Sequence, residues 1–187
     1  LLGTGKAAAN AVAVTFKEIL SQAGIDDGLV FDVKALRATS IRDAAHYGGV
    51  RVETTATLDR ARVPVRIDIG YGDAVNPAPI EIDYPTLLDG PAPHLLAYPR
   101  ETVVAEKLEA VTSLGLINSR MKDFYDLCML ARHFEFDGPT LSNAIAETFK
   151  RHHTPLPTDL PDGLTDAFVG RREVQAQWRA FRTRDRL

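Results

Sequence analysis

The sequence predicts an α+β protein, in which a small mixed sheet, mostly antiparallel, precedes a C-terminal bundle of helices. Gly48–Leu58 and Arg62–Ile69 alternate apolar and polar side chains, which is the period of strands with one buried face. From Arg100 to Phe134 apolar residues recur every three or four positions, which is the period of helices. We therefore expect an α+β core over residues 1–98 and a helical region over residues 99–187.

The first part of the chain contains one helical segment and several short strands. Ala7–Ala23 has helical periodicity, and Leu29–Phe31 and Leu36–Ile41 are short apolar strand candidates. Gly48–Leu58 and Arg62–Ile69 are separated by a short turn, which predicts a β-hairpin with one face packed on a helix and the other polar.

Composition limits the class of protein. With 187 residues and 45% hydrophobic content, the chain can form one ordinary domain or a core with a helical appendage. A net charge of −3 gives no overall basic field, although a local basic patch is compatible with it. The single Cys128 lies in an apolar helical run, so we expect a buried, reduced thiol. There is neither a long apolar run nor a signal-peptide pattern, which predicts a cytoplasmic protein without a membrane contact.

Lys107 occupies an unusual place in the first C-terminal helix. At about 100° per residue, five apolar residues lie within roughly 60° of it, namely Val103, Val104, Ala110, Val111 and Leu114. The lysine is thus expected on the apolar face, with Glu106 and Glu109 pointing away. A buried ammonium is costly unless it is paired or faces a cleft. The alternative is that its long stem snorkels to solvent.

Asp123 repeats this pattern in the following helix. It shares a face with Leu127 and Leu130, and Asp126 lies one step to the side. The alternative is a structural role, because a carboxylate in the first turn is stabilised by the helix dipole. Two inward-facing charges on adjacent helices favour a shared site, so we expect Lys107 and Asp123 to meet directly or through one water.

The segment AEKLEAVTSLGLINSRMKDFYDLCMLAR, residues 105–132, resembles the C-terminal signature of the AbiEii/AbiGii-type nucleotidyltransferases. These are toxin components of bacterial toxin–antitoxin and phage-defence modules, and they are similar to the DNA polymerase β nucleotidyltransferase superfamily. The resemblance implies metal-assisted nucleotidyl transfer with Mg²⁺ or Mn²⁺ and an NTP substrate. It implies Lys107 and Asp123 as the lysine and aspartate of the cleft. Asp126 and Arg120 are secondary candidates for the same site.

In the polymerase β-like scheme, a third carboxylate on a neighbouring strand completes the metal site, and Asp68 resembles that residue. It is expected on the polar face of its strand together with Arg66, a candidate for nucleotide binding. The alternative is that Asp68 only pairs with Arg51 or Arg66. Glu81 and Asp83 have a D-x-D-like spacing on a short strand among prolines, which makes them secondary candidates.

The resemblance also implies that the paired D-x-D carboxylates of the family lie on a strand ending near Leu1. We therefore expect this pair upstream of the chain as given, and we expect the chain itself to be catalytically silent. The cleft would lie between the sheet, with Asp68, and the helices, with Lys107 and Asp123.

Three functional interpretations compete. The first is a toxin that transfers a nucleotide from an NTP to an acceptor, such as the 3′ end of a tRNA or a protein side chain, and that has an antitoxin partner. The second is a non-catalytic family member that acts as a partner-binding module. The third is a domain in which the contact between Lys107 and Asp123 is only a buried ion pair. The first is our prediction.

Overall fold

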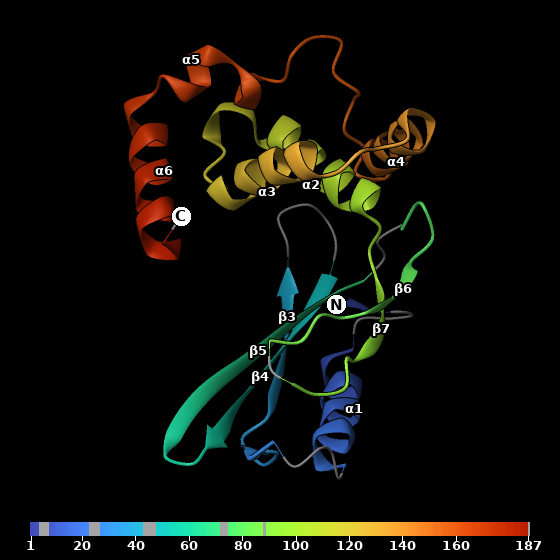
Figure 1. The fold of residues 1–187 in the computed structure, drawn as a ribbon, viewed down its shortest axis with the longest axis vertical. Helices are drawn as coiled ribbons and strands as arrows, with labels where there is room; N and C mark the ends of the chain where they lie inside the picture. The colour runs from blue at the N-terminus through green and yellow to red at the C-terminus, as the bar shows by residue number, and fades with distance from the viewer. Residues whose placement is uncertain (4–7, 23–26, 43–47, 72–74, 88, 187) are drawn as a thin grey trace. The chain divides into compact units, whose positions relative to one another are not determined.

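The computed structural model describes the chain except for residues 4–7, 23–26, 43–47, 72–74, 88 and 187. It has a mixed α+β fold with a small, mostly antiparallel sheet and several helices, as predicted (Figure 1). The chain divides into two compact units, Leu1–Asp73 and Ala74–Leu187. The division precedes the predicted domain boundary and assigns the segment with Glu81 and Asp83 to the second unit.

The sheet of the first unit is built around one long strand. β4 (Gly48–Leu58) pairs along one edge with the antiparallel β5 (Ala61–Tyr71). Its other edge accepts β3 (Arg37–Arg42) and, further along, β2 (Leu29–Phe31). β1 (Leu2–Gly3) pairs in parallel with the end of β5. The predicted hairpin is confirmed. Its second strand, β5, is longer than the predicted Arg62–Ile69.

One face of this sheet is covered by α1 (Ala9–Ser21). Alternation along β4 and β5 directs apolar side chains to that face, where they form the core with α1: Val12, Leu36, Val50, Val52 and Ile69. The ends predicted for this helix, Ala7 and Ala23, lie outside the described residues. The opposite face carries charged side chains, as the alternation predicts.

The second unit consists of a small sheet followed by helices. β6 (Ile80–Asp83) and β7 (His94–Ala97) form a separate antiparallel pair. The helices are α2 (Arg100–Leu114), α3 (Met121–His133), α4 (Gly138–Arg151), α5 (Asp166–Val169) and α6 (Arg172–Asp185). Two short 3₁₀ turns, Gly115–Ile117 and Asp162–Leu164, join them.

Helix α2 packs against both α3 and α4, so it has two buried sides. Glu109 is only 6% exposed, and the expectation that it points away from the core is wrong. The Thr154 hydroxyl, just beyond α4, donates to Glu109 Oε1 at 2.5 Å, and His152 Nδ1 lies 3.7 Å from Glu109 Oε2. The helical periodicity around Lys107 identified the buried side of α2 that faces α3, but it missed the second buried side, which faces α4.

Aromatic and aliphatic side chains together form the core between α3, α5 and α6. The buried members are Met121, Phe168, Val174 and Phe181, and they are surrounded by Phe124, Tyr125 and Trp178. Val174 and Phe181 are seven residues apart on α6, so they lie on the same side of that helix. The other sides of α6 carry mostly polar residues, together with Ala176 and Ala180.

Cys128 is exposed, so the expectation of a buried thiol is wrong. It lies five positions after Asp123, which places it about 140° around the α3 axis from that buried carboxylate. The apolar residues next to Cys128 in the sequence did not predict its exposure, because only part of the surface of α3 packs against other elements. Among the described residues, no helix is both long and apolar enough to cross a membrane.

Candidate functional site

Lys107 is held between two carboxylates. Its ammonium Nζ donates to Asp123 Oδ1 at 2.8 Å and lies 2.6 Å from Asp126 Oδ2. The side chains of Lys107 and Asp123 are 17% and 7% exposed. The direct contact predicted for these two residues is therefore present, and Asp126 joins it.

The local sequence explains how these groups meet. Asp123 and Asp126 are three residues apart in α3, so they project from the same side on successive turns. Gly115 follows α2 with a φ of 49°, a left-handed conformation that favours glycine, and begins the turn that leads the chain back to α3. The Asn118 side chain accepts a hydrogen bond from Arg120 N, which fixes the chain just before α3.

The charges of this cluster stabilise one another. Burial lowers the pKa of Lys107, but the hydrogen bonds to Asp123 and Asp126 outweigh it and raise the pKa above its usual 10.5. Burial likewise raises the pKa of Asp126, but Lys107 and Lys122 outweigh it and hold the pKa below its usual 3.8. Lys107 and Asp126 are therefore charged at neutral pH.

Two further cations surround the cluster. Lys122 Nζ donates to Asp126 Oδ2 at 2.6 Å. Arg120 Nε lies 2.7 Å from Asp123 Oδ2, but the contact lacks hydrogen-bond geometry, so this buried oxygen has no hydrogen-bond donor among the described residues. Lys107, Arg120 and Lys122 outnumber the two aspartates, so the cluster has a net positive charge.

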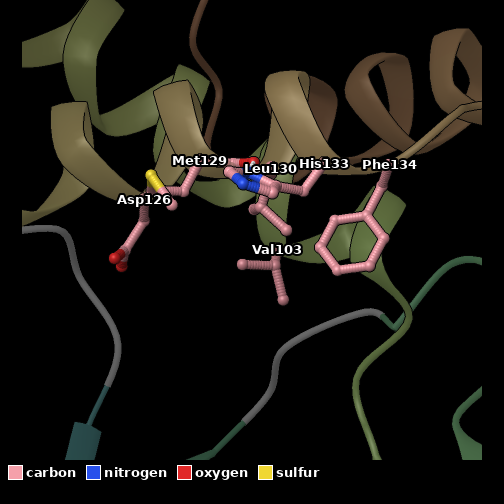
Figure 2. A pocket seen from close by; sticks show the side chains of 6 residues that line it. All are labelled: Val103, Asp126, Met129, Leu130, His133 and Phe134. Atoms are coloured by element: carbon pink, nitrogen blue, oxygen red, sulfur yellow. Dashed lines mark hydrogen bonds between the residues drawn. The ribbon is translucent and has the colours of Figure 1, made fainter.

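An apolar pocket adjoins the cluster at Asp126. It has a volume of ≈ 430 Å³ and lies between α2 and α3, lined by Val103, Asp126, Met129, Leu130, His133 and Phe134. Figure 2 shows the Asp126 carboxylate at one end of this pocket and the Phe134 ring at the other. The Arg100 guanidinium lies 4.0 Å from the centre of that ring. A concave apolar surface thus lies beside a positive charge cluster.

The comparison with protein families decides the identity of the chain. The family described as "Nucleotidyl transferase AbiEii toxin, Type IV TA system" matches residues 1–186. The chain belongs to the AbiEii family. The family implies a nucleotidyltransferase toxin of a type IV toxin–antitoxin system, and hence an antitoxin partner and a nucleotide substrate. No curated protein and no solved structure is significantly similar to the chain.

Within this AbiEii protein, Asp68 lies on the first unit and pairs with Arg51. Arg51 Nε and Nη2 donate to the two carboxylate oxygens of Asp68 at 2.7 and 2.9 Å. These hydrogen bonds lower the pKa of Asp68 below its usual 3.8. Arg66 Nε donates to Glu53 Oε1 at 2.9 Å rather than to Asp68. The ion pair considered as the alternative for Asp68 is therefore present, and its role in metal binding stays a prediction.

Asp68 and Lys107 belong to different units, so the cleft that would join them also stays a prediction. Glu81 and Asp83 lie on β6, which pairs with β7 and not with a described strand of the first sheet. Asp83 Oδ1 lies 2.9 Å from His94 Nδ1, and Glu81 Oε2 lies 3.5 Å from His94 Nε2. Their carboxylates thus face a histidine on the neighbouring strand.

Sequence reasoning missed Lys122 and the direct contact of Asp126 with Lys107. The spacing of Lys122 and Asp126, four residues apart on a helix, is a signal that could have identified that pair. The contact between Lys107 and Asp126 had no such signal, because it depends on how α2 and α3 pack. The buried group formed by Glu109, His152 and Thr154 was missed for the same reason.

Proposed function

We propose that the protein transfers a nucleotide from an NTP to an acceptor hydroxyl, with the 3′ end of a tRNA as the acceptor, and that it acts in the bacterial cytoplasm. Membership of the AbiEii family supports the reaction class. The observation that carries the assignment to a site is the half-buried Lys107 ammonium held by Asp123 and Asp126. In the reaction, the acceptor oxygen bonds to the α-phosphorus while the bond to the pyrophosphate oxygen breaks.

Lys107 is suited to hold the triphosphate. An ammonium has three N–H donors, and the two aspartates engage two of them, which leaves one for a phosphate oxygen. The aspartates also fix the direction of that donor, so little side-chain entropy is lost when the ligand binds. Arg120 and Lys122 add positive charge at the rim, where it would attract the polyanionic substrate.

Asp123 is suited to orient the acceptor. Its Oδ1 positions Lys107, while its Oδ2 is buried and has no hydrogen-bond donor in the described part of the chain. A buried acceptor without a donor costs free energy, and a ligand hydroxyl would remove that cost. We therefore propose that Asp123 Oδ2 accepts the hydrogen bond of the acceptor hydroxyl and aligns its oxygen for attack.

The described residues do not fit the two-metal centre that the polymerase β scheme implies. They contain no group of three or more His, Cys, Asp or Glu side chains able to hold a metal ion. Both oxygens of Asp68 accept hydrogen bonds from Arg51, and β6 with Glu81 and Asp83 pairs elsewhere. Dependence on Mg²⁺ or Mn²⁺ is therefore a proposal that rests on the family alone, and we assign no step to the metal.

A transfer assay tests the proposed reaction. The purified chain is incubated with total tRNA and each radiolabelled NTP in turn, with Mg²⁺, with Mn²⁺, or with a chelator. The proposed transfer predicts that label is incorporated with at least one NTP and one metal, and such incorporation would contradict the expectation that the chain as given is catalytically silent. Lys107→Met should remove incorporation, whereas Lys150→Met, which changes an exposed lysine, should retain it. Equal incorporation by both variants would contradict the role of Lys107.

The same experiment separates a second function, that of a non-catalytic partner-binding module. The observation that favours it is the double hydrogen bond from Arg51, which engages the carboxylate that would bind metal. In this case the wild-type chain would bind an NTP, measured by calorimetry, but transfer no label with any tRNA or metal. Its partner would then be identified by testing the cognate antitoxin directly.

A further inference from the structure

The C-terminal helix concentrates positive charge in a chain that is acidic overall. The segment 171–186 contains six arginines and no lysine, against the two acids Glu173 and Asp185, whereas the whole chain has a net charge of −3. The candidate site uses none of these arginines through the contacts described above. The segment therefore requires its own explanation.

Helix geometry arranges several of these arginines in a row. Arg172, Gln175, Arg179 and Arg182 follow the spacing i, i+3, i+7 and i+10 in α6, so they lie within about 80° of one another. We call these four residues the arginine row. The three arginines are exposed, while the buried Val174 and Phe181 lie on another side of the helix. Figure 1 shows α6 at the edge of the helical unit, next to α3 and α5.

Within the described part of the chain, the positive charges of Arg172 and Arg179 in the arginine row are not neutralised by an acidic side chain. Among the described residues, no carboxylate forms an ion pair with Arg172 or Arg179. By contrast, Arg184 pairs with Asp185, and Arg171 lies 3.9 Å from Glu173. On the helix wheel both acids fall outside the row. Arg172 and Arg179 therefore present uncompensated positive charge to solvent.

We propose that the arginine row binds the phosphodiester backbone of a nucleic acid. A guanidinium donates two parallel hydrogen bonds to a phosphate, which a lysine cannot do, and the row contains only arginines as cations. A protein-binding surface would need an apolar centre, whereas the row has none and the large apolar residues of α6, Val174 and Phe181, are buried in the core. Nucleic-acid interfaces are polar and strongly positive, as this surface is.

The dimensions agree with this ligand. From Arg172 to Arg182 the row extends about 15 Å at about 1.5 Å per residue. One strand of a duplex places a phosphate about every 3.4 Å along its axis, so the row spans about four phosphates. The exposed Arg172 and Arg179 can thus contact phosphates of one strand without a change in the helix.

This binding surface deepens the proposed function by giving the nucleic-acid acceptor a place to bind. It rests on that function only for the choice of acceptor, because binding to phosphates requires neither an NTP nor transfer. The test below contains no NTP. Its failure would leave the transfer assay unaffected, and a negative transfer assay would leave the binding result unaffected.

Trp178 provides the measurement, because it is the only tryptophan in the chain and it borders the row. It precedes Arg179, is half-buried, and has its ring 5.5 Å from that of Phe181. An RNA stem-loop with a single-stranded 3′ end is titrated into the protein, and Trp178 fluorescence is followed at salt concentrations between about 50 and 200 mM. We expect saturable quenching whose affinity falls as salt rises.

The decisive variant is Arg172→Gln with Arg179→Gln, which keeps polar, exposed side chains. Loss of two phosphate contacts should reduce the slope of log affinity against log salt by about 1.4 for a single strand and weaken binding roughly 25-fold at about 0.1 M salt. The matched control is Arg60→Gln with Arg62→Gln, which removes the same charge from exposed arginines of the hairpin. The control should bind like wild type. Far-ultraviolet circular dichroism checks that both variants fold.

Titrations with other polyanions distinguish RNA from DNA as the source of the phosphates. They also distinguish a nucleic acid from an acidic polypeptide as the partner. A DNA duplex that binds as tightly as RNA supports the row as a general backbone site, and weaker DNA binding supports RNA as its ligand. Polyglutamate of equal charge should bind much more weakly than either. Equal affinity for polyglutamate would overturn the proposal in favour of an acidic polypeptide. Equal loss in the variant and the control, or no loss in either, would also overturn it.

Discussion

Arg51 and Asp68 lie directly opposite one another in the β4–β5 ladder, and the Arg51 guanidinium donates to both oxygens of the Asp68 carboxylate. The next pair on the same face, Glu53 and Arg66, has the same arrangement with the charges reversed. This face of the hairpin is thus a ladder of cross-strand ion pairs. Asp68, the carboxylate that would bind metal, is therefore part of this ladder. The ion pair with Arg51 explains its presence without a metal ion.

Two substitutions separate these roles of Asp68. If it binds metal, Asp68→Asn should reduce transfer at least 100-fold, while Arg51→Gln should retain transfer and need less metal for half-maximal rate, because the guanidinium no longer competes. Asp68 is 49% exposed, so solvent screens the ion pair and each change should leave the melting temperature nearly unchanged. Equal transfer rates in the two variants would show that Asp68 serves the ion pair alone.

Lys107→Met should destabilise the protein. It leaves the buried Asp123 carboxylate without its hydrogen-bonded cation, and loss of one partner from a buried pair costs about 3–5 kcal/mol. Since Arg120 still lies close to Asp123, we expect the lower end of that range. Urea denaturation measures the change, with Lys150→Met as the control that should stay within about 0.5 kcal/mol of wild type. A variant as stable as wild type would show that Lys107 is retained for function alone.

The pKa shifts of the cluster predict a pH window. The pKa of Asp126 is lower in the folded protein than its usual 3.8, so its contribution is complete above that value and is lost as the pH falls through the folded pKa. The pKa of Lys107 is raised above 10.5, so its contribution is complete below that value and is lost as the pH rises through the folded pKa. The stability lost in Asp126→Asn should therefore be constant between about pH 5 and 9 and shrink under acid. A loss that does not depend on pH would contradict the ion pair.

Gly163→Ala should destabilise the helical unit. A Cβ atom at this position would lie 3.0 Å from Val111 Cγ1 and 3.2 Å from the Val111 carbonyl oxygen, in the region where the 3₁₀ turn at Asp162–Leu164 packs on α2. Overpacking of this kind costs about 1–3 kcal/mol. The control is Gly138→Ala, since a Cβ there meets no atom within 4 Å and lies in the first turn of α4. A thermal melt should show a lower melting temperature only for Gly163→Ala.

Periodicity predicted the elements whose surroundings are simple. The hairpin strands have one buried face and a two-residue turn, so alternation alone located β4 at its observed bounds. It also predicted that Asp68 lies on the polar face. Its partner could not be chosen, because Arg51 and Arg66 are both on that face and only the register of the ladder selects Arg51.

The helical region was predictable to a lesser extent, because each helix has several neighbours. Lys107 and Asp123 were expected to meet, and they do, since a charge on an apolar face requires a partner. The burial of Glu109 depends on α4, and the group that contacts it, Thr154, is 45 positions away in the chain. A pattern confined to one helix contains no information on such a contact.

The exposed Cys128 gives this protein a single natural site for covalent labelling. It is the only cysteine of the chain and lies on α3, turned away from the Asp123 carboxylate. A maleimide dye or spin label should therefore attach at one defined position without altering the charge cluster. With Trp178 as energy-transfer donor, such a dye would report the distance between α3 and α6 in solution, on the unmodified amino-acid sequence.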